Sequence, residues 1–252
     1  MPRKLGQHFL RRRDILEQIA QAACPQIEPL VVEIGAGRGA LTERLLGRTR
    51  RLIAIEVDPA LADFLRRRFH AATALEIVRA DVLELDLGQW GPAVIAGNIP
   101  YYITSEILER VLALLPRLKR AVLLVQREVA ERIAAPAGRR EYGLLSVRVQ
   151  AVAEPEILFT VPASAFSPPP EVSSALVRLT PRATPLPDWD RLPAFLEFAA
   201  RCFRYKRRTL RNNLAAWYSR SQLDALPETR LRAEQLSAEE LLRLYQTLNS
   251  PV

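Results

Sequence analysis

The sequence has few of the side chains that bind metals or form disulfides. Its 252 residues include two cysteines, Cys24 and Cys202, and two histidines, His8 and His70. The cysteines are far apart and lack the spacing of zinc ligands, and two histidines do not complete such a site. We therefore expect no metal site, and two buried thiols in a reducing compartment such as the cytoplasm.

Long hydrophobic runs are also missing. No apolar stretch approaches the roughly 20 residues that a membrane-spanning helix requires, and the N-terminus lacks the apolar segment of a signal peptide. Hydrophobic residues nevertheless make up 49% of the chain, which is enough for a sizeable core. We expect a globular cytoplasmic protein with one large domain, or a main domain and a smaller one, and no feature requires more than a monomer.

Acidic residues are too few to balance the basic ones. There are 28 Asp and Glu against 36 Lys and Arg, which gives a net charge of +8. An excess of this size is typical of proteins with a polyanionic partner, most often a nucleic acid. Scattered arginines can also be ordinary surface residues, so the clustering of the charges carries more information than their number.

The stretch Leu30–Gly39 predicts a buried strand and then a glycine turn that opens a helix. Glycine permits positive φ in such a turn and lets a ligand lie against the backbone. Gly35, Gly37 and Ala40 also satisfy the dinucleotide-binding fingerprint. Glu33, however, would repel a phosphate and suits a cationic group. The turn thus predicts a nucleoside cofactor without deciding which one, and a turn with no ligand is the alternative.

Three successive predicted strands end in or just before an acid, namely Glu33, Glu56 and Asp81. In a doubly wound sheet the carboxyl ends of parallel strands form the ligand crevice. Carboxylates in that crevice can hold a ligand ammonium or sulfonium, ribose hydroxyls, or an adenine amino group. A single acid at a strand end is usually a turn residue or a helix cap, but three beside a glycine turn indicate a site.

The most specific stretch follows the fourth predicted strand, residues 93–97, and reads Asn98-Ile99-Pro100-Tyr101. The Asn98 side-chain oxygen and the Ile99 carbonyl offer two acceptors close together. Pro100 stiffens the turn and removes a competing donor, and Tyr101 offers a flat face. This set fits an exocyclic amine whose ring stacks on the tyrosine. A rigid loop with core tyrosines is the alternative.

With these motifs, the chain resembles the ribosomal RNA adenine dimethyltransferases, the KsgA family of S-adenosylmethionine enzymes. Matching pieces run in one order almost from end to end, and together they are highly specific. They are Gly6–Leu10, Val32–Gly37, Ile55–Asp58, Asp81, Asn98–Tyr101, Gln126–Val129, Tyr142–Ser146, Phe166–Val172, Lys206–Leu214 and Arg232–Ser237.

The resemblance implies a site for S-adenosyl-L-methionine. Its cofactor-contacting positions would be His8, Leu10, Gly35, Glu56, Asp81 and Asn98. Many relatives have Asn where this chain has His8. Glu56 would take the ribose hydroxyls and Asp81 the adenine amine of the cofactor. Asn98, Ile99, Pro100 and Tyr101 would hold the target adenine, with Phe166 on the other face of its ring.

The expected fold class is α/β: a Rossmann-like methyltransferase sheet with helices on both faces, and a small C-terminal all-helical domain. The methyltransferase domain would span residues 1–180, including a basic N-terminal arm, and the helical domain residues 181–252, after a proline-rich linker. Leu145–Val152 and Ser174–Leu179 are predicted as the last two strands.

Basic residues cluster in three places and predict contacts with the RNA backbone. The predicted RNA-binding residues are Arg11, Arg12, Arg139, Arg140, Arg204, Lys206, Arg207, Arg208 and Arg211. The C-terminal run, Arg204–Arg211, contains no acidic residue. Like charges this close repel each other unless a polyanion neutralises them. The alternatives are a disordered tail for the N-terminal arm, a solvated turn for Arg139 and Arg140, and a solvated basic helix face for the C-terminal run.

The resemblance implies dimethylation of the exocyclic amine of adenine in small-subunit (16S) ribosomal RNA. Two adjacent adenines near the 3′ end are the expected targets, and the small-subunit precursor is the expected partner in ribosome biogenesis. The alternatives are an adenine methyltransferase for large-subunit RNA (the erythromycin-resistance type) or DNA, and an assembly factor that acts by binding. A nicotinamide dehydrogenase explains neither the Asn98–Tyr101 turn nor the basic helices.

Overall fold

A computed structural model describes residues 8–115 and 117–250, so the predicted basic arm before His8 lies outside the described residues. The chain divides into two compact units: residues 1–130 with 156–181, and residues 131–155 with 182–252. The passage between units at Pro181 lies beside the predicted domain boundary, and residues 131–155 additionally group with the C-terminal helices.

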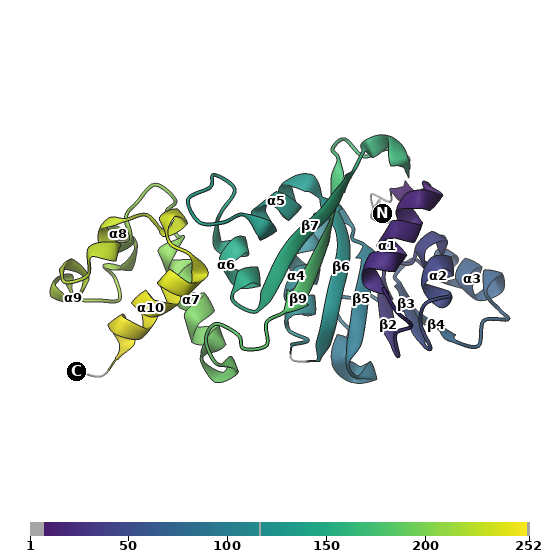
Figure 1. Cartoon of the computed structure of the whole chain (residues 1–252), viewed down its shortest axis with the longest axis horizontal. Helices are drawn as coiled ribbons and strands as arrows, with labels where there is room; N and C mark the ends of the chain where they lie inside the picture. Colours follow the sequence, from purple (N-terminus) through teal and green to yellow (C-terminus); the bar gives the residue numbers. More distant parts are fainter. Residues whose placement is uncertain (1–7, 116, 251–252) are drawn as a thin grey trace. The chain divides into compact units, whose positions relative to one another are not determined.

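The first unit is built on a seven-stranded sheet with the strand order β4-β3-β2-β5-β6-β9-β7 (Figure 1). These strands are β2 (Val31–Ile34), β3 (Leu52–Glu56), β4 (Leu75–Arg79), β5 (Ala93–Asn98), β6 (Leu118–Gln126), β7 (Ala153–Val161) and β9 (Ser174–Pro181). A separate antiparallel pair joins β1 (Phe9–Leu10) to β8 (Phe166–Ser167).

The strands β4, β3, β2, β5 and β6 pair in parallel, and β9 then pairs antiparallel with β6. Every residue of β2 and β3 is buried, as expected for parallel strands covered on both faces. From β2 the chain adds β3 and β4 on one side of β2, and it then returns to add β5 on the other side of β2. The crevice where strand order reverses therefore lies between the carboxyl ends of β2 and β5.

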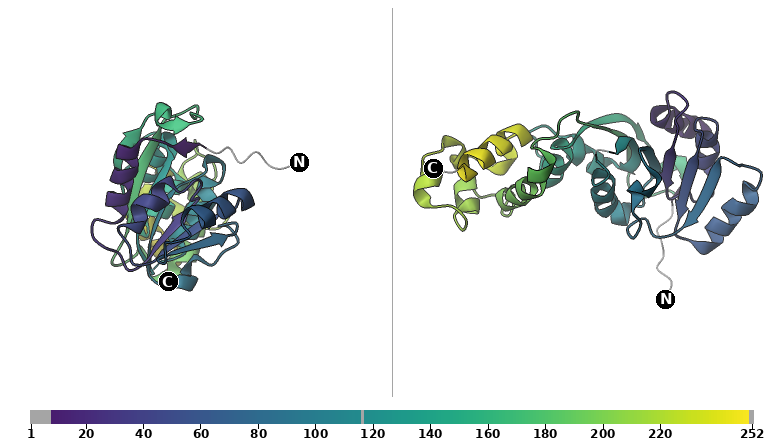
Figure 2. Two further views of the ribbon diagram at one scale, coloured as in Figure 1. Left: turned by 90° about the vertical axis from the view of Figure 1, so that its right-hand side faces the viewer. Right: turned by 90° about the horizontal axis from the view of Figure 1, so that it is seen from below.

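Helices pack on both faces of this sheet (Figures 1 and 2). They are α1 (Arg13–Ala23), α2 (Ala40–Leu46), α3 (Pro59–Arg68) and α4 (Thr104–Leu112), with α5 (Arg127–Ala134) leading into the second unit. Apolar side chains of α1 and α2, including Leu16, Ile19 and Leu45, share one buried cluster with side chains of β2, β3, β5 and β6. The predicted α/β architecture is confirmed.

The second unit is helical. It contains α6 (Leu144–Gln150), α7 (Leu192–Cys202), α8 (Leu210–Leu214), α9 (Arg220–Asp224) and α10 (Ala238–Asn249). Single turns of 3-10 helix in the two units occupy Leu87–Trp90, Tyr101–Ile103, Ala163–Ala165, Trp189–Arg191, Pro227–Arg230 and Ala233–Gln235. Among the described residues, no helix is long and apolar enough to cross a membrane.

One strand prediction is wrong, because Leu145–Val152 falls mostly in helix α6 rather than in a strand. Its alternating valines imitate the period of a strand, but Gly143 and Ser146 set a helix start. The Gly143 N–H donates to Ser146 Oγ over 3.0 Å, and both Val147 and Val149 are buried in α6. Tertiary packing has outweighed β propensity here. The strand in this region is β7, which begins at Ala153, three residues after the end of α6.

Candidate active site

A cavity of about 840 Å³ opens at the carboxyl ends of the parallel strands in the first unit. It is lined by the glycine turn after β2, the ends of β3 and β5, residues 80–83 after β4, and the N-terminal strand β1. This volume lies within the usual range for cofactor pockets. Six predicted cofactor residues line it together: His8, Leu10, Gly35, Glu56, Asp81 and Asn98.

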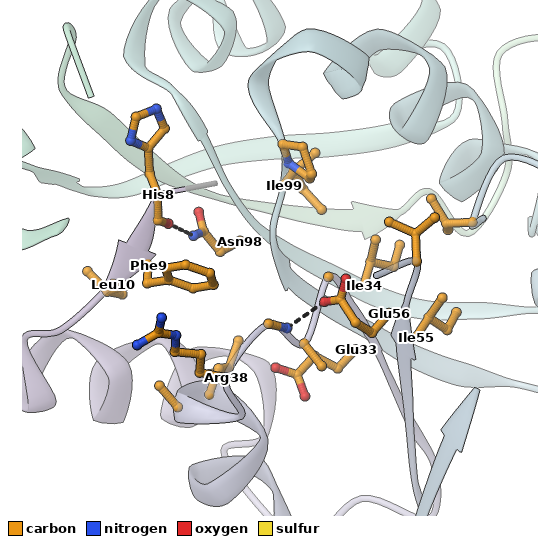
Figure 3. Close-up of a pocket in the computed structure, with 18 of the residues that line it drawn as sticks. His8, Phe9, Leu10, Glu33, Ile34, Arg38, Ile55, Glu56, Asn98 and Ile99 are labelled. Atoms are coloured by element: carbon orange, nitrogen blue, oxygen red, sulfur yellow. Dashed lines mark hydrogen bonds between the residues drawn. The ribbon is translucent and has the colours of Figure 1, made fainter. Parts of the chain in front are cut away.

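The glycine turn has the backbone conformation that its composition predicts. Gly35, Gly37 and Gly39 have φ of 73°, 57° and 77°, in the region that residues other than glycine rarely adopt. The Gly37 N–H donates to Glu56 Oε2 over 2.7 Å, which ties the turn to the end of β3 (Figure 3). The turn is therefore fixed against the end of β3, where it lines the cavity.

Two of the predicted acids are already oriented by backbone donors. Glu56 Oε1 accepts from the Asp58 N–H at 3.0 Å, and Asp81 Oδ1 accepts from the Leu83 N–H at 2.9 Å. Each carboxylate oxygen has more than one lone pair, so both side chains keep acceptor capacity for ligand hydroxyl or amine hydrogens. Their positions at two neighbouring strand ends suit a ribose and a base.

Glu33 differs from the other two acids because it is almost completely buried, with 1% of its surface exposed. Its Oε2 accepts from the Thr42 hydroxyl at 2.6 Å. Burial raises the pKa of Glu33 to about 7; the Thr42 hydrogen bond opposes this and the nearby Glu56 charge adds to it. Glu33 thus lies at the cavity wall as a carboxyl that is half protonated near neutrality.

We expect the Glu33→Gln variant to gain stability over the wild type as pH rises. The unfolded carboxyl titrates near 4.5 and the folded one near 7, so the contribution of Glu33 to the stability of the wild type is complete below pH 4.5 and is lost as the pH rises to 7. The difference in unfolding free energy should grow by roughly 3 kcal/mol across that window. Denaturant unfolding of the cofactor-free protein at several pH values measures it. Glu84→Gln, at an exposed site, is the control, and a pH-independent difference would refute the assignment.

The Asn98–Tyr101 turn lines the cavity at the end of β5. The Asn98 Nδ2 donates to the His8 carbonyl over 3.0 Å, as Figure 3 shows. Since a carbonyl only accepts, this bond fixes which end of the amide is nitrogen and leaves Oδ1 for another partner. The Ile99 N–H donates to the Leu124 carbonyl at 3.0 Å and anchors the turn on β6.

Tyr101 also lines the cavity, but Phe166 does not. The Tyr101 hydroxyl shares a 2.6 Å hydrogen bond with Ser174 Oγ, and its ring stacks on His8 with centroids 5.8 Å apart. Partial burial raises the pKa of Tyr101. Phe166 is 4% exposed and lies in the core cluster with Leu10 and Leu16. The two predicted stacking partners are therefore not brought together in this structure.

The N-terminal strand closes one side of the cavity. Phe9 pairs with Ser167 and Leu10 with Phe166, and His8 Nδ1 lies 2.9 Å from the Pro168 carbonyl oxygen. The Phe9 ring lies against Gly37, where an added Cβ would be 3.2 Å from it. Sequence reasoning did not assign Arg38, whose guanidinium lies 5.0 Å from the centre of the Phe9 ring (Figure 3). Its place inside the glycine turn was the available signal.

The predicted RNA-binding arginines are in different situations. Arg11 lines the cavity, whereas Arg12 forms an ion pair with Asp14. In the second unit, Arg139, Arg140 and Lys206 line a basic pocket of about 550 Å³. Arg232, which sequence reasoning missed, completes this pocket together with Gly138, Glu234 and Gln235.

The remaining members of the C-terminal basic run divide by partner. Arg211 forms a two-bond ion pair with Asp224, a residue 13 positions away that the sequence did not connect to it. Arg204 and Arg208 lie over the Tyr205 ring, and Arg207 is exposed. Among the described residues, no group of three or more His, Cys, Asp or Glu side chains is placed to hold a metal ion.

Comparison with known proteins gives consistent matches. Residues 1–250 match the family described as ribosomal RNA adenine dimethylase. The protein named ribosomal RNA small subunit methyltransferase A from Acidobacterium capsulatum is 43% identical, over 97% of this chain and 90% of its own length. Its namesake from Prosthecochloris aestuarii is 41% identical, over 98% and 93%.

Solved structures agree with the fold. The 23S rRNA methyltransferase ErmE superposes with a TM-score of 0.79 at 29% identity, covering 96% of this chain and 100% of that one. A dimethyladenosine transferase from Plasmodium falciparum gives a TM-score of 0.82 at 26% identity, covering 94% and 96%.

Proposed function

The chain belongs to the ribosomal RNA adenine dimethylase family, and from this we infer that it is an S-adenosylmethionine-dependent rRNA adenine dimethyltransferase acting on small-subunit RNA. One observation carries the inference: the Asn98–Tyr101 turn opens into the same cavity as the glycine turn, Glu56 and Asp81. The finer proposal is that two adjacent adenines near the 3′ end of 16S RNA each receive two methyl groups.

The cavity residues fit S-adenosyl-L-methionine. Positive-φ glycines leave backbone exposed to a ligand, Glu56 suits the ribose hydroxyls, and Asp81 suits the adenine amine. Glu33 adds a buried carboxyl whose ionised form would be favoured by a nearby cation. When bound, the cofactor supplies a methyl group on a positively charged sulfur.

The chain's contribution to catalysis is positioning. The exocyclic nitrogen of adenine is a poor nucleophile because its lone pair is delocalised into the ring. We propose that Asn98 Oδ1 and the Ile99 carbonyl accept the two amine hydrogens and turn the lone pair toward the methyl group. Positioning of this kind supplies several kcal/mol, and no strong base is required, because the proton can leave once the nitrogen is cationic.

The target base must leave its stack to reach the cavity, and Tyr101 would offset part of that energy by stacking on one face. Its hydroxyl bond to Ser174 holds the ring in place. A role for Phe166 on the second face would require its ring to leave the core cluster, since it is buried against Leu10 and Leu16.

RNA binding is proposed for the basic residues of both units. The pocket formed by Arg139, Arg140, Lys206 and Arg232 suits backbone phosphates, and Arg11 would hold RNA beside the cavity. We propose a precursor of the small subunit as partner, a monomer as the active form, and the cytoplasm, where ribosomal RNA of bacteria is matured, as its location.

The test is transfer of labelled methyl from S-adenosylmethionine to undermethylated small subunits, with the product nucleoside identified. Dimethyladenosine on the small subunit is expected. Label on large-subunit RNA would keep the chemistry and change the target. That alternative has less support, because relatives named as small-subunit enzymes are 43% and 41% identical while the 23S enzyme is 29% identical.

An assembly role separable from catalysis predicts a distinct result for Glu56→Ala. This variant loses the acceptor that holds the Gly37 and Asp58 N–H groups, so its affinity for the cofactor should fall by about 10- to 150-fold, the effect of one hydrogen bond to a charged group. Binding to small subunits should be unchanged, because the proposed RNA contacts are other residues.

Equilibrium binding of S-adenosylhomocysteine and co-sedimentation with small subunits measure the two affinities. Glu84→Ala, at an exposed position after β4, is the matched control. Loss of both affinities in a folded Glu56→Ala protein would contradict a separable assembly role.

A further inference from the structure

The second unit exposes two aromatic side chains beside its basic run. Tyr205 is 45% exposed and Trp217 39% exposed. Together with Arg201, Arg204 and Arg208 they form what we call the aromatic–arginine patch. Large aromatic rings are usually buried, so two exposed rings in one place require an explanation.

Arginines and rings alternate across this patch. The Arg201 guanidinium carbon lies 4.9 Å from the Trp217 ring centre, and that of Arg204 lies 6.0 Å from Trp217 and 5.4 Å from Tyr205. The Arg208 guanidinium carbon lies 4.4 Å from the Tyr205 ring centre. Each ring thus has two cations on it, and Arg204 joins the two rings into one continuous surface.

A buried side chain holds this surface in shape. Asn213, 4% exposed, donates from Nδ2 to the Cys202 and Tyr205 carbonyls at 2.7 and 3.2 Å, and its Oδ1 accepts from the Tyr205 N–H. The Trp217 N–H donates to the Leu214 carbonyl at 2.9 Å. The backbone that carries both rings is therefore fixed before any partner binds.

The charge of the patch is only partly neutralised within the protein. Arg201 pairs with Glu197. In the described part of the chain, no carboxylate forms an ion pair with Arg204 or Arg208. The unpaired arginines favour a partner with negative charge, but arginines without aromatic rings would be enough to bind such a partner. The exposed rings indicate that the partner also has flat faces.

We propose that the aromatic–arginine patch stacks an unpaired base of the RNA substrate. Bases stack on tyrosine, tryptophan and guanidinium planes, whereas a phosphate gains nothing from a ring. A base inside a duplex has both faces covered, so the patch selects an unpaired base in a loop, bulge or single-stranded overhang. The inference rests on the proposed function only in taking RNA as the polyanion.

Fluorescence of Trp217 tests this directly. The chain has three tryptophans, so a full-length Trp90→Phe/Trp189→Phe protein reports on Trp217 alone. It is titrated with an RNA hairpin that has an unpaired loop, a blunt duplex with equal phosphates, inorganic polyphosphate, and polyglutamate. Quenching by the hairpin alone is expected. Equal quenching by the duplex or by polyphosphate would reduce the patch to a charge site, and quenching by polyglutamate would assign it to an acidic protein; either result overturns the proposal.

A pair of substitutions at Tyr205 provides the second test. Tyr205→Ala should weaken hairpin binding by about 5- to 150-fold, the range for one base–aromatic stack, whereas Tyr205→Phe should stay within about 2-fold. Wild-type affinity in Tyr205→Ala would refute stacking. Binding is measured without cofactor, so a protein that stacks RNA but transfers no methyl to small subunits would refute the proposed function and leave this inference standing.

Discussion

Replacing Asn98 with alanine is expected to lower the rate of methyl transfer by about 100- to 1,000-fold, the usual effect of removing one preorganised hydrogen-bonding group. The variant loses the oxygen proposed to hold the target amine, and it also loses the bond to the His8 carbonyl. Single-turnover transfer to small subunits measures the rate, and circular dichroism checks folding. Full turnover in a folded Asn98→Ala protein would refute the assignment.

Two further variants make this result specific. Asn212→Ala removes an exposed asparagine from α8 and should leave the transfer rate unchanged. Asn98→Asp keeps an oxygen acceptor but has no N–H to donate to His8, so a rate between those of Asn98→Ala and the wild type is expected. If the Asn98→Asp and Asn98→Ala proteins were equally slow, the His8 bond rather than the acceptor would be the important contribution.

Gly97→Ala is expected to damage both stability and the active site. Gly97 pairs with Ile34 across β2 and β5, and a Cβ on it would lie 2.5 Å from the Ile34 carbonyl oxygen. The obstacle is backbone, so the two strands must separate where the glycine turn and Asn98 begin. Overpacking of this kind costs about 1–3 kcal/mol. The melting temperature should fall by about 2–12 °C, with weaker cofactor binding.

Gly143→Ala is the matched control, because its φ is −169° and no heavy atom lies within 4 Å of the added Cβ. Thermal unfolding should place this variant within about 0.5 kcal/mol of the wild type. If Gly97→Ala had the melting temperature of the wild type, β2 and β5 could separate at little cost. That result would contradict a tight pairing of these strands beside the cavity.

The sequence predicted most of the cavity because its signals are local. A glycine turn after an apolar run, acids at strand ends, and the Asn98–Tyr101 turn each lie within a few residues, and the parallel sheet rule brings them to one edge. The fold class followed from the same strands. The order β4-β3-β2-β5-β6 with β9 reversed beside β6 was not predicted in detail.

What the sequence did not reveal concerns contacts between distant residues. The side chain of Phe166 points into the core because β8 pairs with β1, and no local pattern announces that pairing. The Arg211–Asp224 ion pair joins α8 to α9, so the sequence run looked free of acids when the folded surface is not. Arg232 reaches the basic pocket in the same way. Contacts of this kind depend on tertiary structure, which periodicity does not encode.

The pairing of β1 with β8 has a consequence for the order of events during synthesis. His8 is made before its partner Pro168, which follows 160 positions later. Closing so long a loop is entropically unfavourable until the intervening sheet has formed. We therefore expect the His8 carbonyl to reach Asn98 only after the chain has been translated past Pro168. A nascent chain would contain the glycine turn and its acids early. The hydrogen bond from Asn98 to the His8 carbonyl would form only later, when β1 pairs with β8.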